Sequence, residues 1–288
     1  MEQGRIGATL DRVVTGLEQA SGLDQPADAI GGIVQQATSS DRVKNLLSGA
    51  ALGHALHPMM TDLPIGFWNS ALLLDLVGGH DSGEDLMLLA GGVSALGAAA
   101  TGLSDWSDSV GGARRTGMAH ALLNVTALTL CTGALVARRA GARGTGRFLL
   151  LSGSAVATVS AYLGGHLVYK RGLGVTHAGF ENDETISDWN DAAADSDVHD
   201  NQPLRVDVNG VPVMLVRNSG GLRAFVAACN HAGGPLDEGE FADGAVTCPW
   251  HGSRFSLEDG TVLRGPAAQP QPMLETRVRD GRVEVRAG

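Results

Sequence analysis

The sequence predicts a multidomain protein in which a four-helix transmembrane bundle is followed by a C-terminal all-β domain. Charged residues make up only 18% of the chain, below the roughly 25% expected of a soluble globular protein. Four long apolar stretches occupy the part before residue 171, and short β-branched runs occupy the part after residue 202. A strongly acidic segment separates the two patterns.

We interpret residues 1–56 as an N-terminal amphipathic helical segment. Leu10, Val13 and Leu17 recur at the spacing that places apolar side chains on one face of a helix. Such helices pack on a neighbouring domain or lie at a membrane surface.

Residues 57–171 are expected to form the transmembrane domain. Spanning a bilayer takes ~20 apolar residues, with a range of ~17–25. Of the four apolar stretches given at the end of this paragraph, the third and fourth reach this length and the second is adequate. The first is short and contains Asp75. Small residues recur at every fourth position, which is typical of helices that pack in lipid. The soluble alternative is four buried helices of a large core. The stretches are Leu63–Val77, Leu86–Leu103, Met118–Ala137 and Phe148–Tyr169.

Residues 172–201 are predicted to be a flexible acidic linker. Residues 177–200 contain eight acidic residues and neither Lys nor Arg, which is typical of a solvated segment. The chain has no basic patch with interleaved aromatic residues, so we expect no nucleic-acid partner.

Residues 202–288 are predicted to be a small β domain. Short runs of alternating or β-branched residues are separated by Asn-Gly and Gly-Gly pairs. Asp280-Gly281 suits the tight turn of a β-hairpin.

Two loops of this domain combine thiol and imidazole side chains. Cys229 precedes His231 by two positions, and Cys248 precedes His251 by three. A structural zinc site is the simple alternative, but zinc fingers usually pair Cys with Cys and His with His. Each loop here mixes the two types.

The two loops resemble the Rieske iron–sulfur family, and the resemblance covers residues 202–288. In Rieske centres, two histidines replace two cysteines on one iron of a [2Fe–2S] cluster. The resemblance implies that Cys229 and Cys248 bind one iron and that His231 and His251 bind the other. The Gly-Pro-Ala segment that contains Pro266 matches the proline-bearing segment that covers the cluster.

The surrounding residues resemble the ferredoxin-type branch of that family. High-potential members carry a disulfide between the loops, but here the corresponding positions hold Gly234 and Trp250. Pro249 belongs to the turn of the second loop, and Ser253 matches a hydroxyl that donates to a bridging sulfide. Phe255 stands where the high-potential branch has a tyrosine. Fewer donors to the sulfurs predict a low-to-intermediate reduction potential.

Polar residues in the apolar region suggest a second site. His57, His120 and His166, together with Asp62, are expected near one membrane face in an up-down bundle, and polar groups in the apolar phase often mark a site. Three interpretations remain open: haem b with His120 and His166 as axial ligands, a quinone pocket, or interfacial caps. The stretch from His57 to Gly79 resembles an uncharacterised bacterial membrane family, domain of unknown function 2231.

The leading hypothesis is a membrane-anchored Rieske protein that transfers single electrons between a redox protein partner and the quinone pool or a cofactor in the bundle. The alternatives are a ferredoxin subunit that the helices only anchor, and an iron–sulfur redox sensor. We expect an electron-transfer component rather than a stand-alone catalyst. The expected location is the bacterial inner membrane, with the β domain in the cytoplasm, although this topology places Arg138, Arg139, Arg143 and Arg147 outside, against the positive-inside rule.

Overall fold

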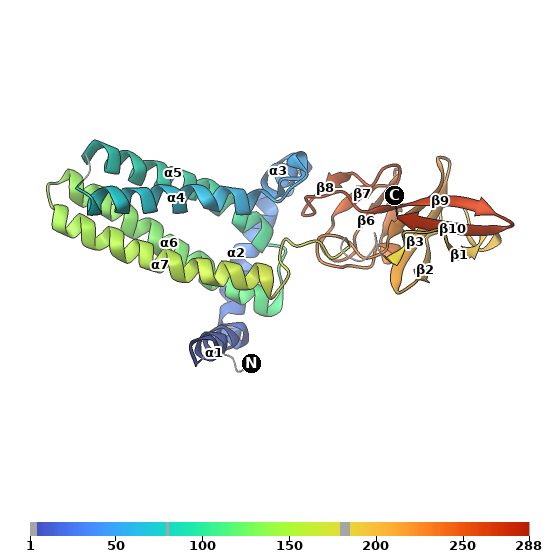
Figure 1. The fold of residues 1–288 in the computed structure, drawn as a ribbon, viewed down its shortest axis with the longest axis horizontal. Helices are drawn as coiled ribbons and strands as arrows, with labels where there is room; N and C mark the ends of the chain where they lie inside the picture. The colour runs from blue at the N-terminus through green and yellow to red at the C-terminus, as the bar shows by residue number, and fades with distance from the viewer. Residues whose placement is uncertain (1–4, 79–80, 179–184, 288) are drawn as a thin grey trace. The chain divides into compact units, whose positions relative to one another are not determined.

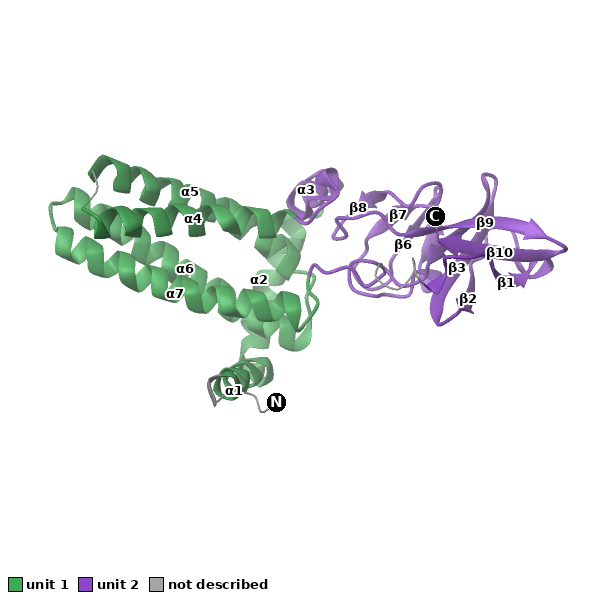
Figure 2. Cartoon of the chain, in the orientation of Figure 1, with its two compact units in different colours: residues 1–39, 56–173 green, residues 40–55, 174–288 purple. Residues whose placement is uncertain are grey.

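The computed structural model describes residues 5–78, 81–178 and 185–287. Within them lie seven α-helices and ten β-strands (Figure 1). The chain divides into two compact units (Figure 2). The first comprises Met1–Ser39 and Leu56–Leu173, and the second comprises Ser40–Ala55 and Gly174–Gly288.

Four long helices form the body of the first unit and pack side by side (Figure 1). Three of them are long and apolar enough to cross a membrane, namely α5, α6 and α7. The remaining helix, α4, contains Asp62, Pro64 and Asp75, which reduce its apolar character. The sequence predicted four spans; four long helices are observed, but the length and composition of only three of them fit a membrane. The helices are α4 (Leu56–Leu76), α5 (Asp81–Trp106), α6 (Gly111–Arg139) and α7 (Arg143–Tyr169).

Small residues let these helices approach closely. A Cβ atom on Gly91 of α5 would lie 2.4 Å from the ring of Trp68 on α4. A Cβ atom on Gly153 of α7 would lie 2.7 Å from the Sγ atom of Cys131 on α6. Both contacts involve the buried core of the four helices. The small residues therefore act at helix–helix contacts, as expected for helices that associate in lipid.

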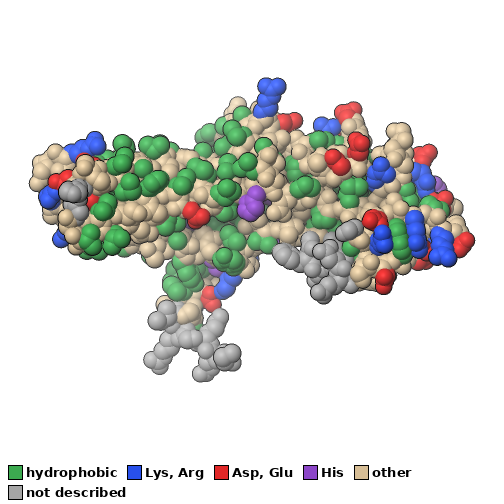
Figure 3. Space-filling view, turned by 45° about the horizontal axis from the view of Figure 1, so that its top comes forward, with side chains coloured by type: hydrophobic (Ala, Val, Ile, Leu, Met, Phe, Trp, Pro, Cys, Tyr) green, Lys and Arg blue, Asp and Glu red, His purple; other side chains and the backbone are tan. Residues whose placement is uncertain are grey.

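The outer surface of the long helices is apolar. Leu96, Val125 and Phe148 are 61%, 62% and 68% exposed. Hydrophobic side chains are spread along the helical part of the molecule in Figure 3. A large exposed apolar surface is typical of a region that contacts lipid or another protein.

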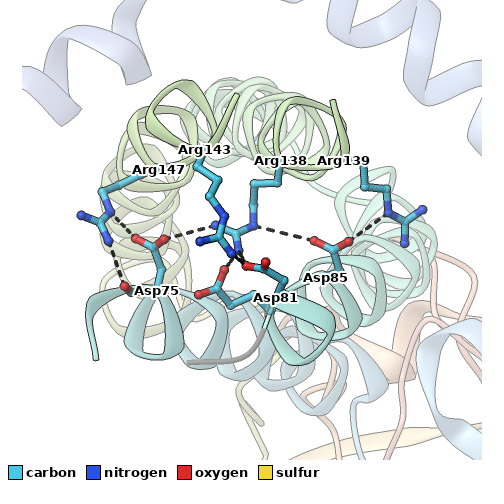
Figure 4. Close-up of polar contacts among 8 residues, drawn as sticks. Asp75, Asp81, Asp85, Arg138, Arg139, Arg143 and Arg147 are labelled. Atoms are coloured by element: carbon cyan, nitrogen blue, oxygen red, sulfur yellow. Dashed lines mark hydrogen bonds and ion pairs between the residues drawn. The ribbon is translucent and has the colours of Figure 1, made fainter. Parts of the chain in front are cut away.

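A network of ion pairs closes one end of the four helices, where α4 connects to α5 and α6 connects to α7 (Figure 4). Arg138 is 5% exposed and contacts the two buried carboxylates Asp75 and Glu84. Arg147 also bonds Asp75, with 2.5 Å between Nε and Oδ2. Arg139 and Arg143 add more exposed pairs with Asp85 and Asp81. The four arginines that oppose the positive-inside rule are thus all paired with acids from α4 and α5.

Two further helices, α1 (Arg5–Gln19) and α2 (Asp24–Ala37), pack at the opposite end of the long helices. Their acidic side chains pair with basic residues at the start of α6 and the end of α7. The pairs are Asp11–Lys170, Glu18–Arg171, Asp24–Arg115 and Asp28–Arg114. This part of the predicted N-terminal segment is helical, and charge pairing contributes to its attachment.

Acidification should loosen α1 and α2. Hydrogen bonds from Arg171 to Glu18 and from Arg115 to Asp24 lower the pKa of each carboxyl below its ordinary value of 4.5 or 3.8. A lowered folded-state pKa gives stability that is present above the ordinary pKa and is lost as pH falls through the lowered pKa. Hydrogen exchange of residues 5–37, corrected for intrinsic rates, should therefore accelerate below about pH 4 relative to α6. Glu18→Gln should accelerate it already at neutral pH, unlike Asp28→Asn, because the Asp28 side chain is 72% exposed. Constant protection down to pH 3 would contradict this prediction.

The β domain of the second unit contains two antiparallel sheets. The larger has the strand order β1-β10-β9-β4-β3-β2, and the smaller has the order β5-β6-β7-β8. Asp280 and Gly281 join β9 to β10 with φ values of 50° and 75°, as a tight hairpin turn requires. The strands are β1 (Asn190–Ala194), β2 (Leu204–Val208), β3 (Val211–Asn218), β4 (Gly221–Val226), β5 (Glu240–Ala242), β6 (Ala245–Thr247), β7 (Arg254–Ser256), β8 (Val262–Arg264), β9 (Met273–Arg279) and β10 (Arg282–Ala287).

The structure corrects the predicted linker at its C-terminal side. Strand β1 pairs with β10, and Ile186 is completely buried in the domain core. Two acids that suggested a solvated linker are paired instead, Asp191 with Arg282 and Asp195 with Arg217. The two arginines are distant in sequence, so the charge pattern of the acidic segment alone could not predict these ion pairs. Residues 179–184 of the predicted linker lie outside the described residues.

The structure also divides the predicted N-terminal segment. Helix α3 (Asp41–Ser48) is a helix as expected, but it belongs to the second unit and contacts β8. Its amphipathic pattern indicated a buried face without indicating which element would cover that face.

Candidate metal centre

The two Cys/His loops share one hydrogen-bond pattern. Cys229 follows β4, and its N–H donates to the carbonyl of the residue five positions later, at 2.8 Å. Cys248 follows β6 and donates to Ser253 in the same way, also at 2.8 Å. In each loop, the carbonyl of the cysteine accepts from a glycine four positions later, and both glycines have positive φ, 77° at Gly233 and 72° at Gly252. Glycine adopts this left-handed conformation without steric cost.

This folding brings like side chains together. The thiols of Cys229 and Cys248 hydrogen-bond to each other and are 1% and 3% exposed. The rings of His231 and His251 have centroids 5.1 Å apart and an interplanar angle of 81°. Both histidines are half-buried. The structure therefore brings together all four predicted ligands as one pair of sulfurs and one pair of imidazoles.

Backbone N–H groups surround the sulfurs. Cys229 accepts from the N–H groups of His231 and Ala232, and Cys248 accepts from those of Trp250 and His251. The hydrogen bond from Cys229, followed by these backbone groups, lowers the pKa of Cys248 to about 6 despite burial. The same sulfur–sulfur bond, together with burial, raises the pKa of Cys229. The backbone N–H groups of both loops therefore favour negative charge on sulfur, which is the form that binds metal.

The imidazole of His231 is held in the neutral form. Burial lowers the pKa of His231 to about 3, with smaller contributions from the positive charges of His251, Lys44 and His177. Neutral imidazole is the form that ligates metals.

The first loop is braced by two polar residues that the sequence did not single out. Asn230 donates through its side chain to the carbonyls of Gln269 and Pro270, both at 2.7 Å. Gln271 is 2% exposed, accepts from the N–H of Asn230 at 3.0 Å, and donates to Val226 and Ala228. Asn230 could have been identified from the sequence, because it lies between Cys229 and His231. Gln271 could not, because no neighbouring motif indicates its role.

The second loop is braced by the predicted cover segment. Ser253 is completely buried, and its Oγ accepts from the N–H of Ala267 at 3.0 Å. Pro266 precedes that N–H and is buried. Phe255 is also completely buried, in the core cluster that contains both thiols. Trp250, in contrast, is 58% exposed.

Gly234 allows the two loops to meet. A Cβ atom at this position would lie 2.7 Å from the Sγ of Cys248 and 3.1 Å from the ring of Trp250. The positions of Gly234 and Trp250 are therefore adjacent across the loops. Pro249 precedes Trp250 in the turn and is exposed.

The donor set fits a two-iron cluster better than a single ion. Among the described residues, no group of three or more His, Cys, Asp or Glu side chains could hold one metal ion. A tetrahedral zinc site needs four ligands at one point, whereas each iron of a Rieske cluster takes only two protein ligands. The paired thiols, the paired imidazoles and the N–H groups directed at sulfur match the two ligands that each iron of a Rieske cluster takes.

The histidines of the long helices do not converge on a common site. Both ring nitrogens of His120 are engaged, and His166 binds a carboxylate rather than His120. Asp62 is exposed. The haem interpretation needs His120 and His166 as a facing pair, whereas each ring here hydrogen-bonds to a separate partner on an adjacent helix or turn. The contacts are His57 Nδ1 to Ala98 O at 3.0 Å, His120 Nδ1 to Ser160 O at 2.8 Å, Asn124 Nδ2 to His120 Nε2 at 3.0 Å, and His166 Nε2 to Glu18 Oε1 at 2.9 Å.

Known proteins match the two parts of the chain separately. Residues 188–277 match the Rieske [2Fe-2S] domain family. Residues 53–177 match the family described as predicted membrane protein DUF2231. Both resemblances expected from the sequence are confirmed.

Curated relatives match about a third of the chain. Apoptosis-inducing factor 3 of Mus musculus is 30% identical over 91 residues, which are 32% of this chain and only 15% of that protein. The anthranilate 1,2-dioxygenase ferredoxin subunit of Burkholderia cepacia is 28% identical over 104 residues, which cover 36% of this chain and 96% of the subunit. The cytochrome b6-f complex iron-sulfur subunit of Chlorobaculum tepidum is 32% identical over 77 residues, covering 27% of this chain and 41% of the subunit.

Among solved structures, the ferredoxin of carbazole 1,9a-dioxygenase from Nocardioides aromaticivorans IC177 is 26% identical, with a TM-score of 0.33, and covers 35% of this chain and 98% of that one. With the Rieske family match, the paired donors of the β domain identify its cofactor as a [2Fe–2S] cluster. The chain therefore joins a domain of the predicted membrane protein family DUF2231 to a C-terminal domain of the Rieske [2Fe–2S] family.

Proposed function

We propose that this protein is a membrane-anchored one-electron carrier. Its cluster would be held by Cys229 and Cys248 on one iron and by His231 and His251 on the other. The observation that carries the proposal is the pairing of like donors by two loops with the same hydrogen-bond pattern, with imidazole centroids 5.1 Å apart. When bound, a Rieske cluster supplies reversible one-electron chemistry at a potential set by charge, hydrogen bonding and exposure.

The residues around the cluster have two roles in this proposal. The four backbone N–H groups stabilise negative charge on the cysteine sulfurs, and Ser253 ties the second loop to the cover segment. Trp250 is exposed, and its ring centroid lies 6.3 Å from that of His251. We propose this histidine-bearing surface as the place where a redox protein docks and exchanges an electron.

The long helices are proposed to serve as the anchor. The exposed apolar side chains of α5, α6 and α7 support contact with lipid, and we propose that α4 crosses with them as a four-helix bundle. The hydrogen bonds of His120 and His166 favour a structural role over haem ligation. Ferredoxin subunits among the relatives support a redox protein as partner. The proposed location is the bacterial inner membrane, with the Rieske domain on the cytoplasmic side.

Optical and EPR spectra of the detergent-purified protein test the proposal. We expect the EPR signal of a reduced Rieske cluster, no haem Soret band, and no reduction of the cluster by a quinol alone. A redox titration should give a low-to-intermediate potential, because Phe255 offers no hydroxyl to the cluster. A Soret band or rapid reduction by quinol would overturn the anchor role. A potential near +300 mV, the top of the Rieske range, would contradict the assignment to the ferredoxin-type branch.

A further inference from the structure

Asn45 of helix α3 takes the place of a neighbouring strand at the edge of the smaller sheet. Strand β8 ends that sheet, and an edge strand presents backbone groups that have no partner strand. The Nδ2 of Asn45 donates to the carbonyl of Leu263 at 3.0 Å, and its Oδ1 accepts from the N–H of Gly265 at 2.8 Å. One side-chain amide therefore satisfies two main-chain groups, which lie 218 and 220 residues away in sequence.

Two more contacts hold α3 at this edge. Asp41, in the first turn, forms an ion pair with Arg264. Ser48, in the last turn, lies so close to Gly265 that a Cβ atom there would be 2.8 Å from the Ser48 Oγ. The first turn, middle and last turn of the helix thus all contact residues 263–265, so the helix has a defined position on the domain.

The segment that Asn45 holds leads directly into the cover of the second cluster loop. Gly265, Pro266 and Ala267 are all buried, and a buried N–H group needs a hydrogen-bond partner. Asn45 supplies that partner at Gly265. Ser253 supplies it two residues later, where the N–H of Ala267 donates to the Oγ at 3.0 Å. The cover segment is therefore fixed at one end by α3 and at the other by the second loop.

The hydrogen bond from Ala267 limits where the Ser253 hydroxyl can donate. Ser253 is completely buried, and its carbonyl accepts from the N–H of Cys248, a proposed ligand, at 2.8 Å. Because its Oγ accepts from Ala267, the hydroxyl hydrogen must point in another direction. Within the described part of the chain this hydroxyl accepts one bond and donates none, and a buried donor without an acceptor is costly. The hydroxyl is therefore free to donate to an acceptor held between the two loops.

We propose that Asn45 is a positioning residue for the [2Fe–2S] cluster and acts through residues 265–267 on the hydroxyl of Ser253. The inference rests on the proposed function, because it requires a cluster in the loops. The redox centre is then discontinuous in sequence, since Asn45 lies outside both matched family ranges, residues 53–177 and 188–277. Hydrogen bonds to the sulfurs tune the potential of such a cluster. Fewer or poorer donors lower it, so releasing the cover segment should lower the potential.

Hydrogen exchange and EPR-monitored redox titration of full-length variants test the proposal. Asn45→Ala should accelerate exchange of the Gly265 and Ala267 amides about tenfold, because two hydrogen bonds are lost. It should lower the equilibrium constant for one-electron reduction about threefold, a potential about 28 mV lower. Ser253→Ala removes the hydroxyl itself and should lower that constant about tenfold, or about 59 mV. Arg42 is exposed on the same helix, so Arg42→Ala should stay within about twofold of the wild type in both measurements.

The double variant separates positioning from simple attachment of α3. In Asn45→Ala with Ser253→Ala, the potential should equal that of Ser253→Ala alone, because Asn45 acts through a hydroxyl that is no longer present. A further fall in the double variant would overturn the proposed route. Faster exchange at Gly265, with Ala267 exchange and the potential unchanged in Asn45→Ala, would show that the residue only attaches the helix.

Asp41→Asn keeps the test usable if Asn45→Ala assembles no cluster. This milder variant removes only the ion pair with Arg264, and should accelerate Ala267 exchange and lower the potential by smaller amounts. Unchanged Ala267 exchange in this variant would overturn the proposal. Absence of a Rieske signal in the wild-type protein would instead refute the proposed function, while the exchange of Ala267 in Asn45→Ala would still show whether α3 braces the cover segment.

Discussion

Cys248→Ala should abolish the [2Fe–2S] cluster. The two thiols lie side by side, each receiving two backbone N–H groups, so removing one leaves an iron without half of its protein ligands. Metal binding also contributes to folding free energy, so the Rieske domain should become less stable as well. Iron and acid-labile sulfide should fall below a tenth of the wild-type content, together with the visible absorbance. Cys229→Ala should have the same result.

The third cysteine provides a matched control. Cys131 is 1% exposed in the core of the long helices and belongs to the first unit. Cys131→Ala should therefore retain the full cluster content and affect only the packing against Gly153. Full cluster content in Cys248→Ala, or loss of the cluster in Cys131→Ala, would show that the ligand assignment is incorrect.

Arg138→Met should strongly destabilise the helical unit. Asp75 and Glu84 are 8% and 4% exposed, and both contact the guanidinium group of Arg138. Removing one partner of a buried ion pair typically costs about 3–5 kcal/mol, and the effect here falls mainly on Glu84 because Asp75 keeps its bond to Arg147. We expect a loss of that size in the free energy of unfolding, measured by circular dichroism during denaturation in mixed detergent micelles.

Two comparisons test whether the loss of stability comes from burial of the ion pair or from the loss of a charge alone. Arg139→Ala removes a residue that is 59% exposed, so its loss should cost about 1 kcal/mol or less. Neutralising the buried acids together with the arginine, as Arg138→Met with Asp75→Asn and Glu84→Gln, should recover part of the stability because no buried charge is left unpaired. Equal effects of the Arg138 and Arg139 variants would contradict the assigned role of burial.

The local features of this protein could be predicted from its sequence. The cluster loops depend on a few residues at fixed spacing, so Cys229, His231, Cys248 and His251 could be identified together. The apolar stretches similarly predicted the long helices, because the pattern that marks a helix is carried within the helix itself.

Features that depend on distant partners could not be predicted in this way. Strand β1 and the turn after it were assigned to the linker, because Asp191 and Asp195 find their arginine partners only in the folded domain. The partner of His166 is Glu18, 148 residues away. Asn45 of α3 bonds the backbone of Leu263, 218 residues away. Spacing along the chain carries no information on these contacts.

The attachment of α3 to the Rieske domain also limits how many times the chain can cross a membrane between α3 and that domain. The chain leaves the second unit after Ala55 and re-enters it at Gly174, and a compact unit held by hydrogen bonds lies on a single side of a membrane. If the long helices span a membrane as proposed, the number of crossings between these two points must be even. Three crossings by α5, α6 and α7 alone would separate Asn45 from Leu263 by a bilayer. With α4 as the fourth crossing the count is even, so the hydrogen bond between Asn45 and Leu263 constrains the topology of helices that neither residue belongs to.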